Sequence, residues 1–127
     1  VGLLDLDDSW LPFAERIERA GFMPPLDMLR NLAECDINLA PLEEGDLFCE
    51  AKSELKFFEA ALVNVPTIAS RTQPFAAAIT DGQNGLLASA PAEWEEKLGR
   101  LVADADLRSR LGAAARETTL ERFTSES

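Results

Sequence analysis

Two lysines and a glutamate stand at helical spacing between residues 51 and 63 of the sequence. At about 100° per residue, Lys52, Lys56 and Glu59 fall within one arc of roughly 60° on a helix surface. An apolar stripe lies about a quarter-turn away and consists of Ala51, Leu55, Phe58 and Leu62. The segment therefore predicts a helix with one face toward the core and a neighbouring face that carries two cations and one carboxylate.

The first turn of this helix favours a cation only when a negative ligand is bound. Lys52 lies there, where the helix dipole disfavours a positive charge by about 0.3–1 kcal/mol. A bound anion would reverse that sign, because it could accept hydrogen bonds from free backbone N–H groups, the Ser53 hydroxyl and both lysines. Glu59, nearly two turns further on, can accept hydrogen bonds from a neutral diol. A diphosphate at one end and hydroxyl groups at the other suit a nucleoside diphosphate.

A simpler alternative is that these side chains form only a surface ion pair. A pair of Lys56 or Lys52 with Glu59 would contribute a few tenths of a kcal/mol on an exposed helix. The two lysines are, however, the only basic residues between Arg30 and Arg71 in a chain whose net charge is −11. They also open the helix that follows a predicted strand. These observations favour the anion site over the surface pair.

The elements that would position this helix alternate between short apolar runs and longer amphipathic segments. Strands are predicted at residues 37–42, 66–70 and 86–88, and helices at about 9–20, 26–35, 51–63, 91–104 and 105–123. A short helical piece is expected within the loop 73–81, and a turn at 81–85. This alternation predicts an α/β fold: a Rossmann-like parallel sheet flanked by helices, with right-handed crossovers.

Two of these elements are expected to pack against the core. The apolar run 37–42 is typical of a buried parallel strand. Leu29, Leu32 and Ala33 would form the core side of helix 26–35. Ligands bind outside the carboxyl ends of the strands in such sheets. The segment after 37–42, which leads into helix 51–63, is therefore where a site is expected.

The composition excludes several classes of function. A net charge of −11 argues against nucleic acid as a partner, because nucleic-acid-binding proteins carry a basic face. The sequence has no histidine, so catalysis by a histidine base or a Ser-His-Asp triad is excluded. Its two cysteines, Cys35 and Cys49, lack the spacing of metal ligands and are interpreted as free thiols in a reducing cytosol. No metal site is expected.

The length and the ends of the sequence indicate one domain. The 127 residues fit a single hydrophobic core, and no stretch reaches the roughly 18 apolar residues that a membrane-spanning helix needs. The opening run VGLL, beginning at Val1, looks like a strand cut from a longer polypeptide. We therefore expect residues 1–127 to be a partial domain of a cytoplasmic protein, with peripheral membrane association left open for the full-length protein.

Other polar and aromatic residues have simpler interpretations. Glu43 and Glu44 are adjacent carboxylates of the kind that acid–base catalysis uses, but a solvated acidic loop is the expected interpretation. Trp94, Leu98 and Leu101 have the spacing of a core stripe. Neither group adds a second candidate site.

Several segments follow one another in a specific order. They are DINLAPLE at 36–43, AKSELKFFEAA at 51–61, VPTIAS at 65–70, DGQNGLL at 81–87, and Trp94. This succession resembles the C-terminal domain of the retaining glycosyltransferases called group 1, or family 4, which have the GT-B fold. The resemblance covers nearly the whole chain from about Gly21, and it is the combined order that is specific.

The resemblance implies roles for the residues of helix 51–63. In that family the matching helix binds the nucleotide-sugar donor, and its closing glutamate, which matches Glu59, hydrogen-bonds the ribose. Residues that match Lys52 and Ser53 approach the diphosphate, and we add Lys56 as a further phosphate contact. Nucleotide-sugar binding is therefore expected on this helix.

One position departs from the family pattern. Many members carry a second glutamate eight residues before the ribose-binding one, where it contacts the transferred sugar. That position is Ala51 here, with Glu50 beside it, so Glu50 is the candidate for the sugar contact.

The resemblance also implies partners and alternatives. A complete enzyme would add an N-terminal Rossmann-like domain with the acceptor site, and would need no metal or cofactor beyond the nucleotide-sugar donor. The chain alone is expected to be inactive. The main alternative is a non-catalytic nucleotide-sugar-binding or interaction module with the same fold, which Ala51 favours slightly. A sugar-nucleotide epimerase is disfavoured, because a Lys-Ser helix fits transferases better.

Overall fold

A parallel three-stranded sheet forms the centre of the computed structural model, which describes residues 8–18, 23–42, 44–45, 47 and 54–125. The strands are β1 (Asn38–Ala40), β2 (Thr67–Ser70) and β3 (Leu86–Ala88), in the order β1-β2-β3. Leu39 pairs with Ile68, and Ala69 pairs with Leu87. All pairings are parallel, which confirms the predicted sheet.

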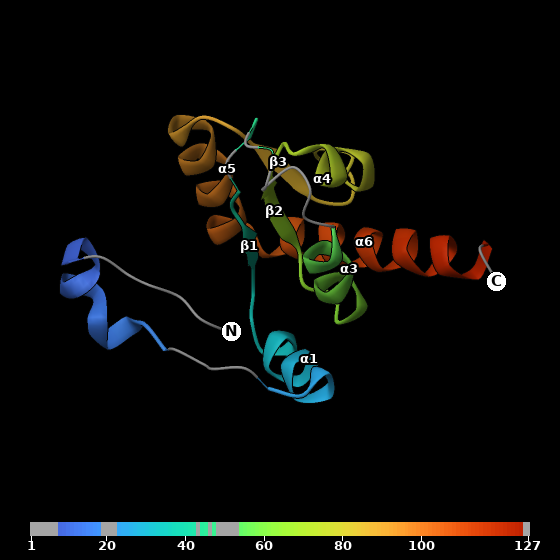
Figure 1. The fold of residues 1–127 in the computed structure, drawn as a ribbon, viewed down its shortest axis with the longest axis horizontal. Coiled ribbons are helices and arrows are strands. Elements are labelled where there is room, and N and C mark those ends of the chain that lie inside the picture. Colours follow the sequence, from blue (N-terminus) through green and yellow to red (C-terminus); the bar gives the residue numbers. More distant parts are fainter. Residues whose placement is uncertain (1–7, 19–22, 43, 46, 48–53, 126–127) are drawn as a thin grey trace.

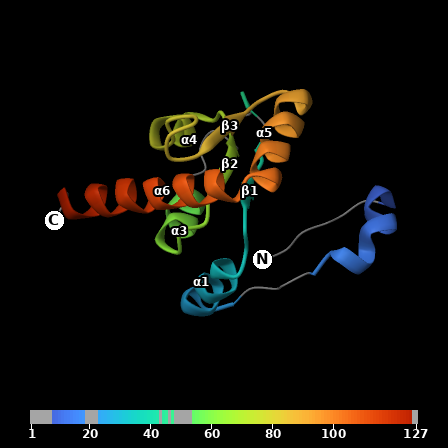
Figure 2. The same ribbon diagram turned by 180° about the vertical axis from the view of Figure 1, so that it is seen from behind.

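Helices connect and flank the strands (Figure 1). They are the 3-10 helix η1 (Asp8–Arg16) and the α-helices α1 (Pro25–Ala33), α3 (Leu55–Leu62), α4 (Gln73–Ala78), α5 (Pro91–Ala103) and α6 (Ala105–Ser125). Helix α6 runs behind the sheet in Figure 1 and in front of it in the reversed view of Figure 2. The predicted α/β fold class is confirmed. Among the described residues, no helix combines the length and apolar character that crossing a bilayer requires.

Two apolar clusters cover the two faces of the sheet. On one face, Phe57 and Phe58 of α3 and Phe75 of α4 pack against strand residues that include Ala69. On the other face, Ile68 packs with Leu101 of α5 and with Leu111 of α6. Successive residues of a strand point to opposite faces, so neighbouring residues of β2 belong to different clusters. All four residues of β2 are therefore buried.

The first strand differs from the prediction of a buried strand. Strand β1 lies at the edge of the sheet and spans only Asn38–Ala40, and the side chain of Leu39 is 51% exposed. Helix α5, which covers that face, packs against β3 at the opposite edge. The apolar run identified a parallel strand correctly, but its burial depended on where the covering helix lies.

The N-terminal helices also pack less than expected. Helix α1 has no buried residue, and Ala33 is exposed while Leu29 and Leu32 are half-buried. The amphipathic stretch predicted at 9–20 is a 3-10 helix over Asp8–Arg16, with Leu11 67% exposed and Phe13 53% exposed. It stands apart from the sheet in both views (Figures 1 and 2). A 3-10 helix has a period of three residues, so side chains spaced for an α-helix do not form one stripe.

Candidate functional site

The carboxyl ends of the three parallel strands lie at one edge of the sheet. Leu42 follows β1, Arg71 follows β2 and Ser89 follows β3. The first two segments are joined directly, because the backbone N–H of Leu42 donates a 2.7 Å hydrogen bond to Oγ of Ser70. Ligands of open α/β sheets bind outside this edge, so the residues that follow the strands are the first candidates.

Helix α3 packs one side against the sheet and leaves the other side exposed. Its buried residues are Phe57, Phe58, Ala60 and Ala61. The predicted apolar stripe is therefore wrong in phase, because Leu55 is 56% and Leu62 is 40% exposed. Two adjacent phenylalanines determine which side is buried, since burying their rings removes more apolar area from water than burying the two leucines.

Two of the five predicted site residues lie within the described part of the chain. Lys56 is exposed and Glu59 is half-buried, and at about 100° per residue they lie about 60° apart on α3. Within the described residues, neither side chain makes an ion pair, so the surface pair of Lys56 with Glu59 is not formed.

The remaining three, Glu50, Lys52 and Ser53, lie outside the described residues. The alternative pair of Lys52 with Glu59 lies partly outside them as well.

The position of Lys56 along the sheet is fixed by its backbone. Nδ2 of Asn38 donates to the carbonyl oxygen of Lys56 at 3.3 Å and to Oγ1 of Thr67 at 3.0 Å. Asn38 and Thr67 are the first residues of β1 and β2. Lys56 therefore lies beside the start of the strands, and the carboxyl edge itself is occupied by other side chains.

Helix α6 holds the beginning of α3. Nη2 of Arg122 lies 3.3 Å from Oε1 of Glu54, the residue that precedes α3. The same guanidinium lies over the ring of Phe58, with its carbon 4.9 Å from the ring centroid. An ion pair and a cation–π contact from one side chain fix two successive turns of α3 against α6.

A cluster of charged side chains that the sequence did not reveal lies at the carboxyl edge. We call it the carboxyl-edge network, and it consists of Glu44, Arg71, Asp81, Ser89, Glu93 and Lys97. Arg71 pairs with Glu93 through two bonds, Nη1 to Oε1 at 2.5 Å and Nη2 to Oε2 at 2.6 Å. Two parallel bonds of this kind combine charge with fixed geometry.

Lys97 is the buried cation of the network. Its side chain is 11% exposed, and its Nζ contacts Oδ2 of Asp81 at 2.8 Å and Oε2 of Glu93 at 3.1 Å. Nζ also donates to the carbonyl oxygen of Leu87 at 2.6 Å. Asp81 in turn accepts from the N–H of Leu87 at 2.9 Å. The ammonium group therefore has three acceptors for its three donors, as a buried lysine requires.

Ser89 links the network to the loop that follows β1. Its backbone N–H donates to Oε1 of Glu93 at 2.7 Å, and its Oγ accepts from Nη1 of Arg71 at 2.9 Å. The Ser89 hydroxyl donates to Oε1 of Glu44 at 2.9 Å. The segments after β1, β2 and β3 are thus joined in one line of hydrogen bonds across the end of the sheet.

Hydrogen bonds lower the pKa of two carboxyl groups of the network, Asp81 and Glu93. Hydrogen bonds from Arg71 and from the N–H of Ser89 hold the pKa of Glu93 well below its ordinary value. Burial by itself raises the pKa of Asp81, but hydrogen bonds from Lys97 and from the N–H of Leu87 lower that pKa overall. The hydrogen bond to Glu93 raises the pKa of Arg71. Acid–base catalysis needs a pKa near the working pH. The side chains of Asp81 and Glu93 are therefore better suited to holding neighbouring residues in place than to transferring protons.

Local sequence patterns contain only part of the signal for this network. Glu93 and Lys97 stand four residues apart on a predicted helix, a spacing that allows an ion pair. Arg71 directly follows a predicted strand. The pairing of Arg71 with Glu93 joins residues that are 22 positions apart in the sequence. No local period of the sequence encodes such a contact.

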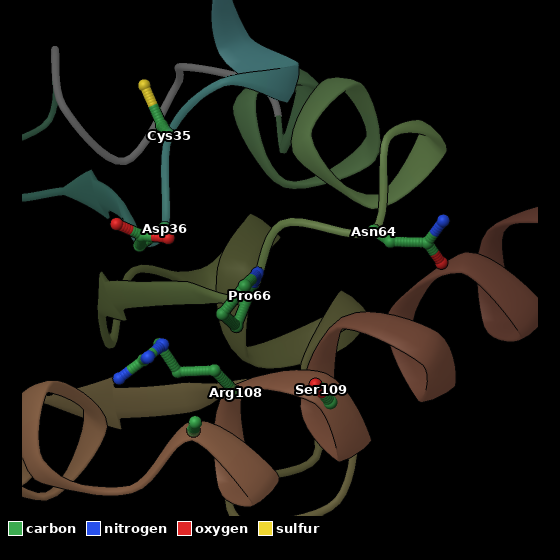
Figure 3. Close-up of a pocket in the computed structure, with 7 residues that line it drawn as sticks. Cys35, Asp36, Asn64, Pro66, Arg108 and Ser109 are labelled. Atoms are coloured by element: carbon green, nitrogen blue, oxygen red, sulfur yellow. The ribbon is translucent and has the colours of Figure 1, made fainter.

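An open pocket of about 230 Å³ lies at the opposite, amino edge of the sheet (Figure 3). It is lined by Cys35, Asp36, Asn64, Pro66, Ala105, Arg108 and Ser109. These residues lead into β1 and β2 or begin α6. Nη1 of Arg108 donates to the carbonyl oxygens of Leu101 at 2.6 Å and Val102 at 3.0 Å. The guanidinium thus satisfies carbonyl groups at the end of α5, which is a structural role.

No cluster of ligand residues suited to a metal ion occurs in the part of the chain that the structure describes.

Comparison with known proteins connects the chain to sugar-transferring enzymes. The sequence profile of the family described as glycosyl transferase-like matches residues 5–127. Over 59 residues, the chain is 39% identical to the D-inositol 3-phosphate glycosyltransferase of Corynebacterium jeikeium (strain K411), a match that covers 45% of this chain and 14% of that protein.

Two solved structures share the fold. The C-terminal domain of the glycosyl transferase group 1 family protein LpcC of Francisella tularensis matches with a TM-score of 0.60 and 18% identity, over 92% of this chain and 65% of that chain. Alr3699/HepE of Anabaena, in complex with UDP and glucose, matches with a TM-score of 0.72 and 20% identity, over 91% of this chain and 30% of that chain. The chain thus spans less than two thirds of the length of each of these three proteins.

Proposed function

Because the chain belongs to the glycosyl transferase-like family, we propose that it is the donor-binding domain of a glycosyltransferase that moves a sugar from a nucleoside diphosphate to an acceptor. The family match over residues 5–127 supports this proposal. It is further supported by the shared fold with HepE, whose structure contains UDP and glucose. We propose residues 1–127 as one domain, working beside an N-terminal Rossmann-like domain of the same polypeptide that supplies the acceptor site.

The donor contacts are assigned to the exposed side of α3 and to the residues before it. In the proposal Glu59 binds the ribose hydroxyls, and Lys52, Ser53 and Lys56 bind the diphosphate. Glu50 is assigned to the transferred sugar. The observation that carries the assignment is that Lys56 and Glu59 share the side of α3 away from the core, with no ion-pair partner among the described residues.

The proposed chemistry is electrostatic. The diphosphate gains negative charge as the sugar leaves, and fixed cations and N–H groups stabilise that charge more strongly in the transition state than in the ground state. No metal or further cofactor is included in the proposal, and the nucleotide-sugar is the donor substrate.

Calorimetry on Glu59→Ala in the full-length protein tests the assignment. Titration with UDP-, GDP- and dTDP-sugars should identify a donor for the wild-type protein, and the variant should bind that donor at least about tenfold more weakly. The matched control is Glu117→Ala, which removes an exposed glutamate of α6 and should leave donor affinity unchanged. Equal donor affinity in Glu59→Ala and wild type would remove this residue from the site.

The second candidate is a nucleotide-sugar-binding module without transfer activity. The observation that favours it is Ala51, which stands where many family members carry the glutamate that contacts the sugar. Donor binding without release of nucleoside diphosphate, in the presence of a range of acceptors, would support the module. Sustained release with a transferred sugar would support the enzyme.

A further inference from the structure

We propose that Arg122 of α6 is a positioning residue for the nucleotide-sugar donor, because it fixes the orientation of α3. This inference rests on the proposed function, since it concerns the same donor. Arg122 itself is assigned no contact with the donor. Its effect is on the direction in which α3 presents Lys56 and Glu59.

Helix α3 needs contacts with its neighbours to keep its orientation. It spans eight residues, Leu55–Leu62, and an isolated helix of fewer than about 12–15 residues is barely stable in water. Its N-cap residue, Glu54, makes no capping hydrogen bond with its side chain. That carboxylate contacts Arg122 instead, with Oε1 3.3 Å from Nη2. The start of α3 is therefore held by a neighbouring helix.

The two contacts of Arg122 lie beside the proposed donor residues. Its ion-pair partner, Glu54, stands two residues before Lys56 in the sequence. The ring of Phe58, with its centroid 4.9 Å from the guanidinium carbon, belongs to the residue directly before Glu59. At about 100° per residue, Glu54 and Phe58 lie about 40° apart on the helix, and Lys56 lies about 160° from both. Arg122 therefore holds α3 from the side away from Lys56.

Helix α6 is well fixed where it packs beside α3 (Figures 1 and 2). Ala115 of α6 is buried in the same apolar cluster as Phe57 and Phe58, and Leu111, one turn earlier, is fully buried. Seven residues separate Ala115 from Arg122, which is about two helical turns, so both lie on one side of α6. The contacts of Arg122 thus extend an apolar contact between the two helices, and together they resist rotation of α3.

A second anchor holds the same end of α3 to the sheet. Nδ2 of Asn38 donates to the carbonyl oxygen of Lys56 at 3.3 Å. A single hydrogen bond allows a helix to turn about it, and a contact from another element removes that freedom. Loss of Arg122 therefore leaves α3 beside the sheet but lets the side chains of Lys56 and Glu59 leave the geometry that binds the donor.

Donor calorimetry on the full-length protein tests the proposal with Arg122→Gln. The probe is the UDP-, GDP- or dTDP-sugar that titration of the wild-type protein identifies. The variant loses the ion pair and the cation–π contact, so the donor Kd should rise about 3–10-fold. It should still fold, because the side chain of Arg122 is 44% exposed.

The matched control is Arg116→Gln, which removes the same charge from an exposed position of the same helix. It should leave the donor Kd unchanged. Equal losses of donor affinity in Arg116→Gln and Arg122→Gln overturn the inference, because the effect is then one of net charge.

A conservative variant separates positioning from a general loss of stability. A lysine ammonium can both pair with a carboxylate and lie over an aromatic ring, so Arg122→Lys should bind the donor within about twofold of wild type. Glu54→Gln, which removes the negative partner, should raise the donor Kd. The double variant Glu54→Gln/Arg122→Gln should bind no more weakly than Arg122→Gln alone, because both changes break one ion pair. Additive losses overturn the role of this pair.

Donor binding and the end of α6 should also be linked in the reverse direction. A ligand that prefers the fixed orientation of α3 stabilises, by the same factor, the contacts that fix it. Amide hydrogen exchange at residues 119–122 should therefore slow by about 3–10-fold when the donor binds the wild-type protein. The same amides should not respond to the donor in Arg122→Gln, and an equal response in both proteins overturns the inference.

The outcomes distinguish this inference from the proposed function. A wild-type protein that binds none of the three kinds of nucleotide-sugar overturns both. Weaker donor binding in Glu59→Ala, with wild-type binding in Arg122→Gln, overturns only the inference. A lower unfolding temperature of Arg122→Gln with an unchanged donor Kd also overturns it, because the role is then structural. If Arg122→Gln does not fold, Glu54→Gln decides: a raised donor Kd supports the inference and an unchanged one overturns it.

Discussion

The two edges of the sheet are held together by different forces. At the carboxyl edge, charged side chains of the carboxyl-edge network join the segments that follow β1, β2 and β3. At the amino edge, the backbone itself makes the close contacts. A Cβ atom on Gly112 of α6 would lie 2.2 Å from the carbonyl oxygen of Asn64. The contacts at the carboxyl edge therefore depend on the charge and orientation of side chains. The contact at the amino edge depends on the small volume of Gly112.

This difference indicates how the chain separates stability from ligand binding. Asn64 has φ of +61° after the end of α3, a conformation that asparagine tolerates better than most residues. Its carbonyl then approaches α6 so closely that only glycine fits. At the carboxyl edge, where ligands are expected, the described contacts between the strand-following segments are hydrogen bonds and ion pairs made by side chains. Four predictions test this contrast.

The largest effect is expected for Gly112→Ala at the amino edge. The added methyl group would force α6 away from the loop before β2 and lower the free energy of unfolding by about 3 kcal/mol. The matched control is Gly99→Ala in α5, where a Cβ would meet nothing within 4 Å. That variant should gain about 0.5–1 kcal/mol from helix propensity. Equal stabilities in denaturant unfolding would contradict the close contact.

The next largest effect is expected for Lys97→Met at the carboxyl edge. Methionine fills similar space but leaves Asp81 and the carbonyl of Leu87 without their buried donor, which should cost about 2 kcal/mol. Lys56→Met, which changes an exposed lysine of α3, should alter the free energy of unfolding by less than about 0.5 kcal/mol. Similar losses in both variants would show that burial of Lys97 does not matter.

Acid should weaken the carboxyl edge. Lowered pKa values for Asp81 and Glu93 mean that their stabilising effect is complete above the ordinary carboxyl pKa of about 4. It is lost as the pH falls below that value toward the lowered ones. Unfolding curves measured from about pH 6 to about pH 3 should show a smaller loss of stability for Asp81→Asn than for wild type. An identical loss would exclude Asp81 from the pH dependence.

The smallest effect is expected for Cys35→Ser in the pocket of the amino edge. The thiol is exposed and donates a weak hydrogen bond, 3.7 Å long, to the carbonyl oxygen of Asn31. The substitution should change the free energy of unfolding by less than about 0.5 kcal/mol, and donor affinity should not change. A clear loss of donor affinity would move the functional site toward this edge and reverse the comparison.

The sequence predicted the elements whose signals are local. β-Branched residues identified β2, a short apolar run identified β3, and helical spacing with a proline at the start identified α5 at Pro91–Ala103. Leu101 is fully buried as its spacing predicted, and Trp94 packs against the cluster to which Leu101 belongs. In these segments one pattern determines both the type of element and its buried side.

Features that depend on distant neighbours were predicted less well. The exposure of Leu39 follows from the position of α5, and the buried side of α3 follows from Phe57 as well as Phe58. The partners of Arg71 and Lys97 come from segments that only the folded chain brings together. For the candidate site, the residue types on α3 could be predicted from the sequence, whereas the carboxyl-edge network could be identified only in the structure.

The position of the short strand β1 at the edge of the sheet has a consequence for self-association. Within the described residues β1 pairs only with β2, and a strand edge without a second partner is the kind of surface on which another chain can pair. Two features limit that recruitment: β1 spans only Asn38–Ala40, and Pro41 follows it with no N–H to offer. Replacing Pro41 would restore a backbone N–H at this position and remove one of the two limits.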